Sequence, residues 1–82
     1  MSKILIELYV PAITSTYDIY VPANAHVATL LPLFDSAVKN LSHGLYASSN
    51  AVLCCGDTGI IFSSRMTVKD MNLKNGSRLM LL

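Results

Sequence analysis

The stretch Val27-Ala-Thr-Leu-Leu-Pro-Leu-Phe-Asp-Ser-Ala-Val-Lys-Asn-Leu-Ser42 decides the fold, because it carries the one convincing helical rhythm in the chain. Its apolar residues recur at intervals of three and four and so share one helix face. They are Val27, Leu30, Leu31, Phe34, Val38 and Leu41. Gly44 suits a left-handed C-terminal cap, with Leu45 folding back on the last turn. We predict one helix over about 27–42, irregular in its first turn because Pro32 follows closely.

The segments on both sides of this helix alternate with the two-residue period of strands that turn one side to a core. Before the helix, a strand over 4–10 and a second over 16–21 are joined by a turn, which predicts a hairpin. After it, we expect a loop over 45–50, a strand over 51–55 and a tight turn over 56–59. A short strand over 60–62, a helical turn capped by Thr67 and a last strand over 78–82 should follow.

The expected order of elements is β-β-α-β-β-β, which makes this an α+β chain with a mixed sheet and one helix packed on one face. Two hairpin strands, a crossing helix and a returning sheet form a β-grasp. We expect a single domain over 1–82, since 82 residues leave room for one modest core.

The composition points to binding. The chain is 52% hydrophobic and only 13% charged, so some apolar surface is expected to stay outside, where it would serve a protein partner or self-association. The net charge is +1 and the basic residues are scattered, which argues against nucleic acid. No run of about 18 apolar residues is present, so we expect no direct membrane insertion. The N-terminus is a poor signal peptide, and cysteines without a disulfide framework favour the cytoplasm.

Three short motifs resemble the ubiquitin superfamily. Members of that superfamily often carry the residue types of Thr67-Val-Lys-Asp-Met-Asn-Leu73, at this spacing, before the last strand. The pair Gly44-Leu45 after the helix and the apolar segment from Val52 to Gly56 also match. Together these motifs lie between residues 44 and 73. The resemblance implies a ubiquitin-like β-grasp.

Two departures from that pattern refine the expected function. The sequence stops at Leu79-Met-Leu-Leu82 without the Gly-Gly tail that modifiers and sulfur carriers present for adenylation. Its helix is also about one turn longer. In both respects the chain is similar to the small tail-less ubiquitin-like proteins of bacterial type VII secretion, of the YukD and EsaB type, and to the ubiquitin-like domains of their membrane components. The resemblance implies a non-conjugating interaction module that regulates or assists such a system.

No catalytic, metal or cofactor site is expected. Cys54 and Cys55 are neighbours on a regular strand and point to opposite faces, so they do not share a metal. Their Cα atoms would lie ~3.8 Å apart, nearer than the roughly 4.4–6.8 Å of ordinary disulfides. We expect Cys54 to fill the core beside Val52. Asp57-Thr-Gly59 matches half of an aspartic-protease dyad and is more simply a turn.

The candidate partner-binding surface lies on the sheet face away from the helix. If Ile6, Leu79 and Leu81 pack on the helix, alternation sends the intervening residues outward. The expected surface consists of Leu5, Tyr20, Leu53, Met80 and Leu82. In ubiquitin-like folds this face is the main docking surface. The resemblance therefore implies a protein partner there, such as a membrane-bound secretion component.

Two alternatives stay open at this stage. One is a modifier or sulfur carrier whose Gly-Gly tail is absent from this sequence, which a longer reading frame would reveal. The other is a redox or metal protein that uses Cys54 and Cys55, which metal analysis and thiol titration would test.

Overall fold

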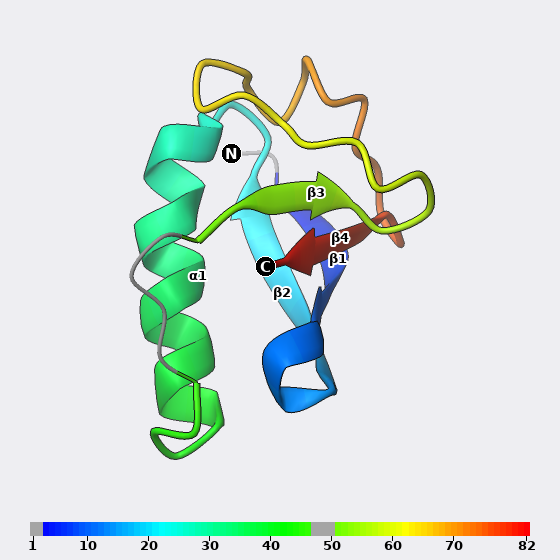
Figure 1. Cartoon of the computed structure of the whole chain (residues 1–82). Coiled ribbons are helices and arrows are strands. Elements are labelled where there is room, and N and C mark those ends of the chain that lie inside the picture. The colour runs from blue at the N-terminus through cyan, green and yellow to red at the C-terminus, as the bar shows by residue number, and fades with distance from the viewer. Residues whose placement is uncertain (1–2, 47–50) are drawn as a thin grey trace.

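The computed structural model describes residues 3–46 and 51–82, in which one helix lies across a mixed sheet of four strands (Figure 1). β1 (Lys3–Val10) and β2 (Ser15–Pro22) form an antiparallel hairpin. β4 (Arg78–Leu81) runs parallel to β1, and β3 (Leu53–Cys55) is antiparallel to β4. The order β2-β1-β4-β3 makes the first and last strands central neighbours, which confirms the predicted α+β architecture.

The hairpin turn is a short 3₁₀ helix, η1 (Pro11–Ile13), followed by Thr14 with a φ of 49°. Along β2 the odd and even residues alternate between partly covered and exposed up to Val21, which is buried. This alternation confirms that the first two strands each turn one side to the core.

Helix α1 (Val27–Leu41) matches the predicted span and is anchored at its first turn by the chain that follows β3. The N–H of Val27 donates to the C=O of Met66 at 2.8 Å, and that of Ala28 to the C=O of Ser64 at 3.1 Å. These bonds satisfy two of the N–H groups that every helix leaves without internal partners. His26 occupies the N-cap position, but its side chain makes no capping hydrogen bond.

The C-terminal end of α1 closes with the two backbone bonds of a Schellman motif. The N–H of Gly44 donates to the C=O of Lys39, and that of His43 to the C=O of Asn40. The expected left-handed cap is therefore present, with positive φ at both His43 and Gly44. The expected contact of Leu45 is wrong: Leu45 is 79% exposed, and Tyr46 is buried in its place. The rest of the expected loop, 47–50, lies outside the described residues.

The chain between β3 and β4 follows the prediction except at one element. Residues 60–62 do not form a strand, and only a single bridge joins Ile61 to Cys54. The predicted helical turn is present: the Thr67 N–H donates to the Asp70 carboxylate while the Asp70 N–H donates to the Thr67 hydroxyl, both at 3.1 Å. This reciprocal pair is a capping box.

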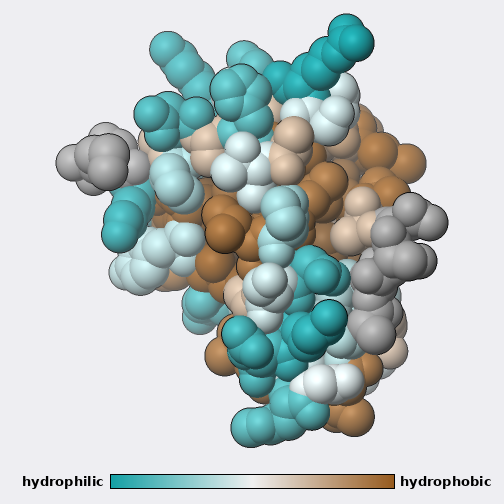
Figure 2. All heavy atoms as spheres, turned by 90° about the vertical axis from the view of Figure 1, so that its left-hand side faces the viewer, coloured by the Kyte–Doolittle hydropathy of each residue, from teal (hydrophilic) through white to brown (hydrophobic). Residues whose placement is uncertain are grey.

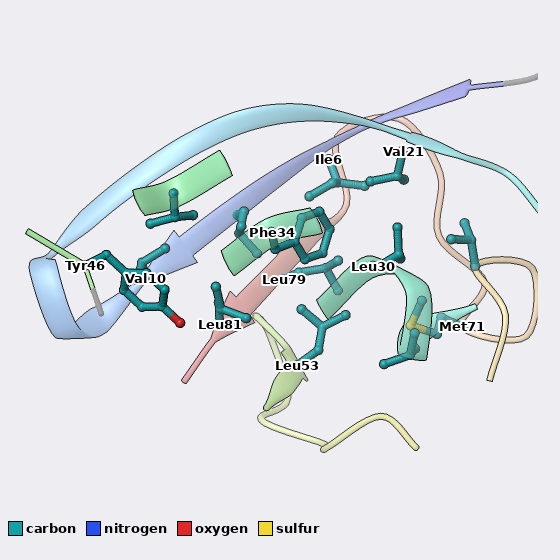
Figure 3. Close-up of a cluster of buried hydrophobic side chains, with 14 residues drawn as sticks. Ile6, Val10, Val21, Leu30, Phe34, Tyr46, Leu53, Met71, Leu79 and Leu81 are labelled. Carbon is teal, nitrogen blue, oxygen red and sulfur yellow. The ribbon is translucent and has the colours of Figure 1, made fainter. Parts of the chain in front are cut away.

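The hydrophobic core fills the space between the sheet and α1, where side chains from every strand meet the helix (Figure 3). Its buried members are Ile6, Leu8, Val10, Val21, Val27, Leu30, Phe34, Val38, Tyr46, Leu53, Val68, Met71, Leu79 and Leu81. Leu41, expected on the buried face of the helix, is instead 53% exposed.

Leu53 is a correction to the expected docking surface, because it lies in this core and is 1% exposed. Its cross-strand partner is Leu81, and Cys54 pairs with Met80 on the opposite face. A one-residue change of parity moves every side chain of a strand to the other face. The segment from Val52 to Cys55 contains no polar residue that would indicate which side chains face solvent. The sequence alone therefore could not show which alternate residues of this strand point into the core.

Candidate docking surface

The sheet has one face that α1 does not cover, which we call the outer face. Strand register brings Tyr9, Met80 and Cys54 into one row across β1, β4 and β3, and the Cys54 bridge extends that row to Ile61. Beside this row, Leu82 and Val52 exchange two backbone hydrogen bonds. These residues give the outer face an apolar zone, the outer patch, which consists of Tyr9, Val52, Ile61, Met80 and Leu82.

The outer patch is accessible. Ile61 is 65% exposed, Leu82 52% and Tyr9 37%, whereas Leu79 and Leu81 on the helix-facing side of β4 are fully buried. Cys54 lies in the same row but is 1% exposed, so it forms the floor of the patch. Exposed apolar side chains gathered on one sheet face are typical of a surface that binds a partner.

Of the five residues predicted to bind a partner, four lie on the outer face. Met80 and Leu82 belong to the outer patch. Leu5 and Tyr20 are cross-strand partners on the same face, with Tyr20 67% exposed, but they lie apart from the patch. Leu53 is on the core side. The apolar surface is therefore divided in two.

A row of charged residues makes this division. Asp18, Glu7 and Arg78 are register partners across β2, β1 and β4, between the Leu5–Tyr20 pair and the outer patch. The Arg78 Nε donates to a Glu7 carboxylate oxygen at 3.0 Å. Since both side chains are substantially exposed, this ion pair contributes only about 0–1 kcal/mol to stability. It places both signs of charge between the two apolar parts of the outer face.

An open depression of about 300 Å³ lies along this charged row. It is lined by Glu7, Tyr9, Thr16, Gly56, Arg78 and Met80. Gly56 forms a low edge of this depression because glycine has no side chain. A larger residue would not fit there, since a Cβ at position 56 would lie 2.8 Å from the Arg78 Cβ. The Gly56 N–H also donates to the Arg78 C=O, which fixes this close approach.

The two thiols differ in their surroundings. Both cysteines are free. Burial raises the pKa of Cys54, and the neighbouring Cys55 raises it further. The Thr58 hydroxyl, with the backbone N–H groups of Thr58 and Asp57, lowers the pKa of Cys55. Within the residues 3–46 and 51–82, no group of three or more His, Cys, Asp or Glu side chains has a geometry suited to a metal ion.

The opposite, helix side of the molecule also carries hydrophobic side chains, mixed with polar ones (Figure 2). Leu33 and Leu41 are each a little more than half exposed, and with Ala37 they occupy positions i, i+4 and i+8 of one stripe. In the part of the chain that the structure describes, no helix has the length and apolarity needed to cross a bilayer.

Sequence reasoning missed Tyr9, Val52 and Ile61 as members of the outer face. The alternation of β1 already placed Tyr9 on the side of Leu5, so strand parity alone would have found it. Val52 was missed with Leu53, through the reversed parity of β3. Nothing in the sequence indicated that Ile61 lies on the outer face, because its position depends on a single bridge to Cys54.

No protein-family model matches the sequence, and no curated protein is significantly similar to it. Solved structures are similar in three dimensions. The EccD5 ubiquitin-like domain from Mycobacterium xenopi has a TM-score of 0.75 at 15% identity, with 100% of this chain and 94% of that chain covered. The fold is the ubiquitin-like β-grasp.

The same β-grasp occurs in larger assemblies. A chain of an ESX-5 inner membrane complex matches with a TM-score of 0.73 at 19% identity, over 100% of this chain and 21% of that chain. A chain of the toluene 4-monooxygenase HD complex matches with a TM-score of 0.77 at 10% identity, over 98% of this chain and 96% of that chain. At such identities the likeness concerns the fold.

Proposed function

We propose that this β-grasp chain is a non-catalytic protein–protein interaction module that docks through its outer face. The observation that carries the proposal is the exposed outer patch, which no described part of the chain covers and which borders a paired acid and base. Apolar contact supplies the driving force of such docking, and the central charges supply its orientation. The similar chains of the ESX-5 and monooxygenase complexes support this role, since both structures are described as complexes.

The assembly that fits best is a type VII secretion system, in which this chain acts in the cytoplasm as an accessory or regulator. The support is the structural likeness to the EccD5 ubiquitin-like domain and to a chain of the ESX-5 inner membrane complex. The partner is a membrane-bound component of that system. In this role the chain has no turnover and needs no cofactor.

The test compares tagged variants in the native cell. The wild-type chain should co-purify with a membrane-bound component of the secretion system, while Met80→Asp and Leu82→Asp should lose most of it, because a charge in the outer patch would be buried without a partner. Lys39→Glu, on the helix, is the matched surface control. Equal recovery of that component with all four chains, or none with the wild type, would reject the proposal. Circular dichroism confirms that each variant is folded.

A further inference from the structure

The Glu7–Arg78 ion pair can face a second copy of itself with opposite charges in contact. It therefore indicates which partner the outer face binds. Its two side chains come from adjacent parallel strands, in register and on the same face. Suppose two outer faces meet about a two-fold axis that runs along these strands, between β1 and β4. Glu7 of each copy then faces Arg78 of the other. An axis across the strands would instead set like charges against each other, so charge selects one of the two arrangements.

The next row of the outer face fits the same axis. Tyr9 and Met80 are register partners across β1 and β4, so each copy's Tyr9 would meet the other's Met80. Contact between an aromatic ring and a thioether is favourable. In the charged row, Asp18 of one copy would lie opposite Gly56 of the other. Gly56 has no side chain, so the edge of the depression leaves room for Asp18 there. No like charges meet in either row.

We propose that the outer face binds a second copy of this chain in a two-fold dimer centred on β1 and β4. This inference rests on the proposed role of the outer face as a docking surface, and the second copy occupies that face when the secretion component is not bound. The largest cross-section of a molecule of 30 × 24 × 21 Å is no more than the roughly 800 Å² per partner of a standard interface, so the outer face alone offers less than that area. An interface below standard size is typical of reversible association, so the dimer is expected to depend on protein concentration.

Sedimentation equilibrium with charge-reversed variants tests the pairing. The wild-type chain should show a concentration-dependent dimer. Glu7→Arg or Arg78→Glu should each weaken self-association by about 10-fold or more, because every charge at the centre then meets its own sign. A one-to-one mixture of the two variants should form heterodimers with near wild-type affinity, since an all-basic centre faces an all-acidic one. Lys39→Glu changes the net charge as Arg78→Glu does and should leave dimerisation unchanged.

Three results would overturn the dimer: a wild-type chain that stays monomeric up to millimolar concentration, a mixture no more associated than its components, or a loss with Lys39→Glu as large as with Arg78→Glu. The wild-type mass decides the question even if a variant fails to fold. A monomer that still binds the membrane-bound secretion component through Met80 would reject only the dimer. A dimer whose outer-patch variants still bind that component would reject only the proposed function.

Discussion

The two faces of the sheet are built from the same four strands but carry opposite kinds of apolar surface. On the helix side, Leu53, Leu79 and Leu81 are at most 1% exposed, and α1 covers them. On the outer side, Tyr9 of β1 is 37% exposed and lies next to an ion pair, and Leu82 and Ile61, which flank the strands, are more than half exposed. The comparison teaches that hydrophobic content alone does not separate core from binding surface. What separates them is whether another element of the chain covers the face.

Truncating one side chain on each face of the sheet tests most directly whether the two faces differ in burial. Leu53→Ala should lower the free energy of unfolding by about 2–5 kcal/mol, because it leaves a cavity in the core. Met80→Ala should lower it by about 1 kcal/mol or less, since that side chain is only partly covered. Urea denaturation measures both. Equal losses would show that the two faces do not differ in burial as described.

Two glycine substitutions sharpen the account of the outer face. Gly56→Ala should cost about 1–3 kcal/mol, because its Cβ would press on the Arg78 Cβ at 2.8 Å. Gly59→Ala, in the same turn, meets no neighbour within 4 Å, but its φ of 76° should cost about 1–2 kcal/mol. The discriminating measurement is dimerisation, which only Gly56→Ala should change. If Gly59→Ala changed it equally, the low edge at Gly56 would have no role.

The cysteines show that exposure also varies within a face, because Cys54 lies on the outer face but is buried, whereas Cys55, on the other side of β3, is partly exposed. Cys55 should be alkylated faster and at lower pH than Cys54, because its pKa is lowered and its side chain is less covered. Thr58→Val removes the hydroxyl that contributes most to this effect and should shift the Cys55 profile to higher pH. Peptide mapping after iodoacetamide pulses at several pH values measures both rates. Faster reaction at Cys54 would contradict its place on the floor of the outer patch.

The smallest expected effect concerns the capping box at residues 67–70, which supports the loop that docks on the helix. The Thr67 N–H lowers the pKa of Asp70 from its ordinary value of 3.8, so the stabilisation is present above that value and lost as the pH falls through the lower, folded pKa. Asp70→Asn should reduce the melting temperature slightly at neutral pH. The difference from the wild type should shrink at acidic pH. A difference independent of pH would reject the carboxylate's role.

The success of sequence reasoning depended on polar residues that mark a strand's solvent side. Glu7 and Asp18 fixed the phase of the hairpin, and the helix followed from its three-and-four spacing. Leu53 was misplaced because its apolar neighbours carry no such mark. The Glu7–Arg78 contact, 71 residues apart in sequence, was beyond reach because it depends on the parallel pairing of β1 with β4. The position of the candidate docking surface was therefore predicted in part, and the ion pair at its centre was not.

The most direct test of the outer face as the binding surface is methyl NMR of the chain in a concentration series. The account predicts that the methyl signals of Ile61, Met80 and Leu82 shift as the protein is concentrated, while those of Leu33 and Leu41 on the helix stay fixed. Shifts confined to Leu33 and Leu41 would contradict the account, because they would place association on the helix side.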